Sequence, residues 1–217
     1  MEKKYKTVPE GAMLRIIALK DFADVKKGDR GGLIDKEENL SQEGNCWVYE
    51  NAGIHGDAVI YENAKIYGYA QVGGDAKVHD NAQIFGGALV YDNAEVCDNA
   101  VVCGKAKIGD FPKLYGDARV FGTARVSENA KVCGNAKISG DVEVYGKAKI
   151  SGNVKLWSTM KSLTDASIET RKDYIIFTNK KDFYIIPLSS YIGRLVAEDI
   201  YYVKNIQTIR QIYGKEI

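Results

Sequence analysis

An aliphatic residue recurs at every sixth position from Val48 to Leu156. The nineteen positions are Val48, Ile54, Ile60, Ile66, Val72, Val78, Ile84, Val90, Val96, Val102, Ile108, Leu114, Val120, Val126, Val132, Ile138, Val144, Ile150 and Leu156. Four residues after each one stands a small residue, which is alanine except at Pro112, Val142, Val154 and Met160. Helices repeat every 3.6 residues and strands every two, so a period of six with turn residues inside it predicts a β-helix.

One hexad illustrates the physics of the repeat. Val72 points into the coil, and its neighbours Gln71 and Gly73 point outward because adjacent strand residues face opposite sides. Gly74-Asp75 forms the corner, since Gly and Asn tolerate the positive φ that tight turns demand. Ala76 re-enters beside the corner, where only a small side chain fits. Three hexads close a triangle, so the repeat predicts a little over six coils, about 30 Å tall.

The pattern of an aliphatic residue, spacers and a small residue resembles that of the hexapeptide-repeat family. The resemblance implies a left-handed parallel β-helix. We therefore predict an all-β chain of about six triangular coils over residues 47–160, with an N-terminal strand and cap over 1–46 and a small C-terminal α+β module over 161–217. The strand in the cap is expected over 14–19.

The segment before the repeats strengthens this resemblance. Asp21-Phe22, Asp24-Val25-Lys26, Gly31-Gly32, Asn39-Leu40-Ser41 and Gly44-Asn45-Cys46-Trp47 look like the lead sequence of a bacterial and prophage group of acyltransferase-like hexapeptide proteins. With the repeats counted, the likeness covers roughly residues 14–160. It marks the family more specifically than it marks a function.

Composition limits the partners of the chain. The net charge is +1, which gives no general attraction to nucleic acid or to an anionic membrane. There is no run of eighteen apolar residues and no apolar segment typical of a signal peptide, so we expect a cytoplasmic protein. Its cysteines, Cys46, Cys97, Cys103 and Cys133, do not form a disulfide framework. We expect no metal site, because neither histidine aligns with two of them.

Outward residues recur on one face of the prism every eighteen positions. One face and its corner carry a ladder of aromatic residues: Trp47, Tyr49, Tyr67, Phe85, Phe121 and Trp157. Exposed apolar ladders are usually covered. We expect this one to pack on the C-terminal module, through residues such as Tyr184 and Tyr191, or on another copy of the chain. Ligand stacking on the rings is the alternative.

The other two faces carry the histidine and tyrosine candidates for binding, and basic candidates flank the strands on all three faces. Tyr61, His79 and Tyr115 share one face, and His55 and Tyr91 share the other. Residues 48–104 carry two lysines and eight acids, whereas 105–161 carry eleven Lys or Arg and five acids. Lys113, Arg119 and Arg125 belong to this basic half. They form either a solvated surface or a surface for a nucleotide, CoA phosphates or an acidic partner.

From Lys161 the six-residue register is lost. Two apolar runs, 173–178 and 183–186, flank the polar segment 179–182 and predict a hairpin that ends at Pro187. Residues 189–214 predict one or two short helices.

Two functions remain open on the sequence. The resemblance implies an active site in a cleft between two subunits of a trimer. There, enzymes of the resembled family transfer an acyl group from acyl-CoA to a hydroxyl or amine, with a histidine as general base. Here no loop interrupts the repeat, and the two histidines, His55 and His79, lie on different faces. We therefore favour a non-catalytic, cofactor-free homotrimeric scaffold, such as a phage accessory factor that binds a host protein or a small nucleotide. The alternative is an acetyl-CoA-dependent acyltransferase that uses His79.

Overall fold

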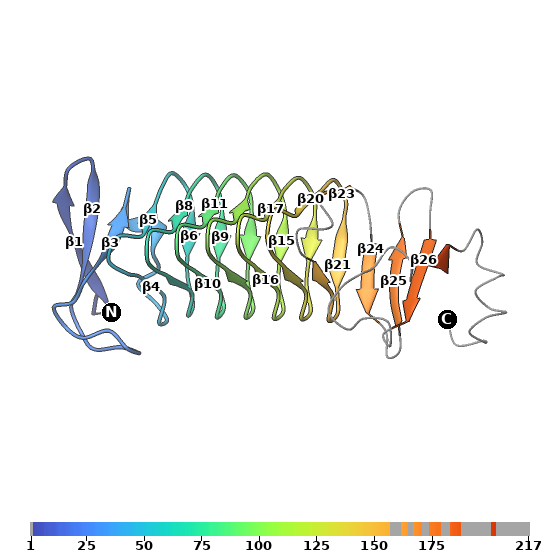
Figure 1. Ribbon diagram of the computed structural model, residues 1–217. Coiled ribbons are helices and arrows are strands. Elements are labelled where there is room, and N and C mark those ends of the chain that lie inside the picture. The colour runs from blue at the N-terminus through green and yellow to red at the C-terminus, as the bar shows by residue number, and fades with distance from the viewer. Residues whose placement is uncertain are drawn as a thin grey trace.

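The computed structural model describes residues 2–156, 162–164, 167–170, 174–178, 183–187 and 201–202. These residues form an all-β parallel solenoid, in which coils stack along one axis and three sheets run along its sides (Figure 1). Strands of neighbouring coils pair in parallel eighteen residues apart, as Ile66, Ile84 and Val102 do. The predicted parallel β-helix with three sides is confirmed.

Each sheet is named here by its first strand that belongs wholly to the hexad repeat. The β5 sheet contains β1 (Tyr5–Glu10), β2 (Met13–Ala18), β3 (Arg30–Ile34), β5 (Gly53–Ile54), β8 (Gln71–Val72), β11 (Leu89–Val90), β14 (Lys107–Ile108), β17 (Arg125–Val126), β20 (Glu143–Tyr145) and β23 (Ser162–Thr164). The β4 sheet contains β4 (Trp47–Val48), β7 (Lys65–Ile66), β10 (Gln83–Ile84), β13 (Val101–Val102), β16 (Arg119–Val120), β19 (Lys137–Ile138) and β22 (Lys155–Leu156). The β6 sheet contains β6 (Val59–Ile60), β9 (Lys77–Val78), β12 (Glu95–Val96), β15 (Lys113–Leu114), β18 (Lys131–Val132), β21 (Lys149–Ser151), β24 (Ser167–Thr170), β25 (Tyr174–Thr178), β26 (Phe183–Pro187) and β27 (Tyr201–Tyr202).

The core is the stack of aliphatic residues that the six-residue period predicts. All nineteen, from Val48 to Leu156, are buried, and so are the alanines beside the corners. Pro112, Val142 and Val154 occupy the alanine position and are buried as well. Burying one Val, Leu or Ile side chain stabilises the fold by about 1.5–3 kcal/mol. Rows of such residues on three sides hold the coils together.

The corners hold a positive φ at the same place in every hexad. Glycine occupies many of them, but acidic residues occupy seven: Glu50, Glu62, Asp80, Asp92, Asp98, Asp110 and Glu128. The sequence predicted Gly and Asn there. At the Asp98-Asn99 corner the aspartate has the positive φ, of 55°. The reason is a hydrogen bond along the axis: the Asp98 carboxylate accepts the backbone N–H of Gly116 in the next coil, at 2.8 Å.

The N-terminal segment covers the end of the first coil (Figure 1). Strands β1 and β2 form an antiparallel hairpin, and β3 pairs antiparallel with β2 and parallel with β5. The buried Tyr5 ring meets Trp47 edge-on at 6.2 Å, and its hydroxyl donates to the carbonyl oxygen of Leu40 at 2.6 Å. The expected strand over 14–19 is confirmed as β2. The segment before it contains a further strand, β1, which the sequence did not predict.

The solenoid has about seven turns, one more than predicted. Parallel pairing extends beyond both ends of the aliphatic rows. At the start, β3 pairs with β5, and a short 3-10 helix, η1 (Glu37–Asn39), leads to a parallel bridge between Leu40 and Ile60. At the end, β23 pairs with β20, and β24 pairs with β21. The extra coil comes from segments that lack the six-residue pattern.

The predicted C-terminal hairpin is confirmed, since β25 and β26 pair antiparallel and β26 ends at Pro187. The helices predicted over 189–214 lie outside the described residues, except at 201–202, where β27 pairs with β26. No helix in the described part of the chain is long and apolar enough to cross a membrane. All four cysteines are free thiols, as expected.

Candidate active site

His79 is the centre of a cluster of charged and polar side chains on the β6 sheet. It follows β9, so its ring points outward from the coil, between Tyr61 one coil before it and Cys97 one coil after it. The Tyr61 and His79 rings stack at 4.6 Å with an interplanar angle of 10°. Only 16% of the His79 side chain is exposed. Its ring plane is therefore set by packing.

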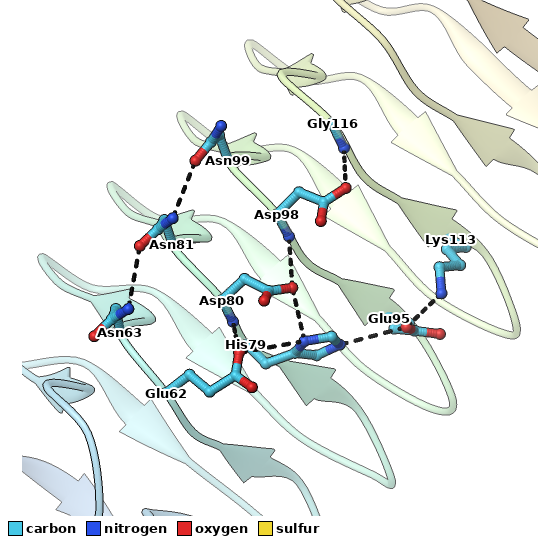
Figure 2. A network of polar contacts seen from close by, with 10 residues as sticks. All are labelled: Glu62, Asn63, His79, Asp80, Asn81, Glu95, Asp98, Asn99, Lys113 and Gly116. Carbon is cyan, nitrogen blue, oxygen red and sulfur yellow. Dashed lines mark hydrogen bonds and ion pairs between the residues drawn. The ribbon is translucent and has the colours of Figure 1, made fainter.

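Acidic groups contact both nitrogens of the His79 ring (Figure 2). On one side, Nδ1 lies 3.0 Å from the Asp80 carboxylate and 4.0 Å from that of Glu62. On the other side, Nε2 lies 3.4 Å from Oε1 of Glu95. A neutral imidazole has one N–H, so with Nδ1 donating to Asp80 the nitrogen that carries the lone pair is Nε2, on the side of Glu95. That arrangement orients a histidine as a proton acceptor.

Lys113 completes the cluster from the coil that follows Glu95. Its Nζ donates to Glu95 at 2.6 Å, and it lies 6.0 Å from the centre of the Tyr115 ring. Burial alone would raise the pKa of Glu95, but the hydrogen bond and charge of Lys113, with help from His79, lower it overall. The same hydrogen bond raises the pKa of Lys113. Both groups are therefore charged at neutral pH.

Ladders that run along the solenoid axis hold the acids in place (Figure 2). The Glu62 carboxylate accepts the backbone N–H of Asp80 at 2.8 Å, and Asp80 accepts that of Asp98 at 3.0 Å. The bond from Asp98 is the largest cause of the lowered pKa of Asp80. Side-chain amides form a parallel ladder, in which Asn63, Asn81 and Asn99 bond at 3.3 Å. Asp80 is thus fixed beside His79 as an ionised carboxylate.

Two cysteines lie on the same face. Cys97 is only 4% exposed, and burial raises its pKa to about 11. Tyr115 forms a hydrogen bond with Cys133, and this hydrogen bond, with burial, raises the pKa of Tyr115 to about 12.

Ligand atoms of His79, Glu95 and Cys97 lie within 4.8 Å of one another, a grouping that a metal ion could use. The two other such groups in the described residues are Glu62, His79 and Asp80, and Asp80, Cys97 and Asp98.

An open hollow of about 500 Å³ lies beside this cluster, and its lining includes Glu95 and Lys77. The other lining residues are Asp57, Asp75 and Asn93. The hollow therefore reaches the cluster at Glu95, the residue that faces His79 Nε2.

The fold brings together four of the eight predicted binding residues: Tyr61, His79, Lys113 and Tyr115. His55 and Tyr91 lie on the β5 sheet, where His55 Nε2 meets the Gln71 side chain at 2.6 Å and Nδ1 lies 3.4 Å from Asp35. Arg119 is exposed on β16, and Arg125 is exposed on β17. Those four residues are spread over the other two sheets and form no common site with His79.

The aromatic ladder was predicted to dock on the C-terminal module or on another copy. Trp47 is instead 1% exposed beneath the chain's own N-terminal segment, with Phe22 edge-on at 5.4 Å. The Tyr49 hydroxyl donates to Asp24, at 2.9 Å from its nearer oxygen. Both side chains therefore contact residues of the N-terminal cap.

The rest of the ladder remains on the β4 sheet. Tyr67 and Phe85 stack at 4.7 Å, and Phe121 is exposed. Docking through these three rings stays a prediction. Trp157 and Tyr191 lie outside the described residues, and of Tyr184 only its place in β26 is described.

The sequence argument missed Asp80, Glu62 and Glu95. Glu95 was counted only in the net charge, although the residue that precedes each aliphatic also points outward, and Asp80 and Glu62 are corner residues that were assigned to turns. Glu95 precedes Val96 and Cys97 follows it, so both flank one inward residue on the β6 sheet. Counting both positions would have placed Glu95 beside His79.

Comparison with known proteins finds one local likeness. No protein-family model matches the chain. A segment of 40 residues is 55% identical to an Escherichia coli K12 protein named "Uncharacterized acetyltransferase YdcK". That segment is 18% of this chain and 12% of the length of the relative. The parallel solenoid is consistent with the hexapeptide-repeat resemblance, and the chain is a β-helix protein with partial similarity to an acetyltransferase.

Proposed function

We propose that the chain transfers an acyl group from acyl-CoA to an amine or hydroxyl, with His79 as the general base. One observation carries the proposal: His79 Nδ1 lies 3.0 Å from the Asp80 carboxylate, while Tyr61 stacks on the ring. A base that is fixed in this way by a third group is the recurring arrangement for activating a weak nucleophile. The partial similarity to a protein named as an acetyltransferase supports the same reaction class.

In the proposed step, His79 Nε2 takes the proton of the acceptor N–H or O–H. The lone pair of the acceptor nitrogen or oxygen attacks the thioester carbonyl carbon and forms the new bond. The carbon–sulfur bond then breaks, and the CoA thiolate takes the proton from the imidazolium. Asp80 stabilises the ring while it is charged, because its carboxylate lies against Nδ1–H. No redox step or metal ion is needed for this balance.

Charge on the β6 sheet supports the choice of an anionic donor. Lys113 and Lys131 stand side by side in the parallel register, and Lys149 follows Lys131 in the next coil. Like charges that stand directly opposite each other in a sheet destabilise it. Phosphates of CoA would relieve this repulsion. The row begins two coils beyond His79, and an extended ligand that lies along the sheet could reach both.

We also propose that the chain forms a homo-oligomer. The family resemblance implies a left-handed coil and a homotrimer with the site at the join between copies. In that arrangement a second copy would close the open face over His79. The interpretation as a phage factor that binds a host protein or a nucleotide gains no support from the relative, and it stays a hypothesis.

Turnover by the full-length chain tests the proposal. Acetyl-CoA is incubated with a panel of amines, amino sugars and hydroxyl acceptors, and released CoA thiol is measured. The His79→Asn variant should lose about 10²–10⁴-fold in rate, the range for general-base catalysis. The matched control is His55→Asn, the other histidine of the chain, which should keep the wild-type rate. Equal turnover by wild type and His79→Asn would contradict the proposal.

A further inference from the structure

His79 and Glu95 face each other through two atoms that can both accept a hydrogen bond. When Nδ1–H donates to Asp80, the Nε2 lone pair points at Oε1 of Glu95, 3.4 Å away. Lys113 contacts the same Oε1 atom, at 2.6 Å. Two electron-rich atoms at that distance are stabilised by a cation between them, which is either a proton or a metal ion.

The distance fits a tetrahedral ion. Two N or O ligands that each lie about 2.1 Å from a tetrahedral zinc ion are roughly 3.4 Å apart. Nε2 and Oε1 have that separation already. The Cys97 thiol is the third donor, and all three ligand atoms fall within 4.8 Å of one another. The sulfur atom must come within about 2.3 Å of the ion to bind it.

The other nitrogen of His79 is placed as in zinc proteins. A metal-bound histidine almost always donates its second N–H to a carboxylate or carbonyl, which fixes the ring and raises its basicity. Asp80 fills this role at 3.0 Å and is itself held by the backbone N–H of Asp98. We infer that His79, Glu95 and Cys97 bind one Zn²⁺ ion, with Asp80 positioning the histidine.

The site goes beyond the proposed acyl transfer and does not depend on it. Three protein ligands leave a fourth position open for water or another molecule. The thiol must lose its proton to bind the ion, so affinity rises with pH and binding releases a proton. If His79 is also the base, zinc occupies the lone pair that the base needs, and the ion would act as a reversible inhibitor.

Cobalt(II) serves as the probe, because it takes the place of zinc and a thiolate bond to it gives a near-ultraviolet charge-transfer band. The full-length reduced chain is titrated with Co²⁺ alone. We expect one ion per chain, the charge-transfer band, visible bands of tetrahedral intensity and loss of all of them on addition of Zn²⁺. Absence of the near-ultraviolet band at saturating Co²⁺ would overturn the inference.

Single variants assign the ligands. Cys97→Ser should remove the charge-transfer band, and Cys103→Ser, the control on the β4 sheet, should keep it. Asp80→Asn should weaken Co²⁺ binding about 10–100-fold without moving the band, the size expected for a group that orients a ligand. A band that survives in Cys97→Ser would assign the thiolate elsewhere and refute the site. None of these measurements uses enzymatic activity, so failure of acyl transfer and failure of metal binding are distinguishable.

Discussion

Replacing Gly104 by alanine tests the stacking of one glycine corner on the next. Gly104 has a φ of +72°, and an added Cβ would lie 2.9 Å from the backbone nitrogen of Gly122 and 3.0 Å from its carbonyl oxygen. Alanine at positive φ costs about 1–2 kcal/mol. Pushing against backbone atoms of the next coil adds about 1–3 kcal/mol, as overpacking does. Gly104→Ala should therefore lower the free energy of unfolding by about 2–5 kcal/mol.

Gly56→Ala is the matched control. Its φ is +62°, but the nearest atom to an added Cβ is the carbonyl oxygen of Gly74 at 3.3 Å, so most of the steric cost is absent. We expect a loss of about 1–2 kcal/mol from the backbone alone. Urea unfolding followed by circular dichroism measures both variants. Losses that agree within about 0.5 kcal/mol would refute the argument that contact between stacked corners limits the residue at this position.

Two further predictions concern the core and the acidic ladder. Ile108 is fully buried in the middle of the stack, so Ile108→Ala should cost about 2–5 kcal/mol in thermal unfolding, whereas Lys107→Ala on the exposed side should change it by less than about 0.5 kcal/mol. Equal effects would mean that the hexad rows do not face inward. The backbone N–H of Asp98 is the main cause that lowers the pKa of Asp80 below its usual 3.8. That stabilisation is complete above this value and is lost as the pH falls through the lowered pKa, because the unfolded chain takes up the proton first. Asp80→Asn should make urea midpoints less sensitive to pH below about 4, and an unchanged acid profile would argue against the ladder.

The six-residue period was enough to predict the parallel coil and its core, because Ile84 and its counterparts follow one geometric rule. The ends could not be predicted in the same way. Trp47 looked available for docking, but Tyr5 and Phe22 cover it from segments far away in the sequence. Burial of this kind depends on tertiary packing, which no local pattern encodes.

The candidate site was predicted only in part. His79 and Tyr61 were chosen from the eighteen-residue spacing and Lys113 from the basic half of the repeat, and the structure brings them together. Asp80 was missed because a corner residue was assigned to turn formation alone. In the structure its carboxylate accepts the backbone N–H of the next coil and also contacts His79, and both contacts depend on the stacking of coils.

Imidazole NMR of the full-length chain during a titration with acetyl-CoA is the most direct test of the claim that His79 marks the functional face. The chain has two histidines, so the His55→Asn variant assigns both sets of signals. We expect the His79 signals to shift in a saturable manner, while those of His55, on the β5 sheet, stay in place. Saturable binding that shifts only His55, or no shift of His79 at saturating acetyl-CoA, would contradict it.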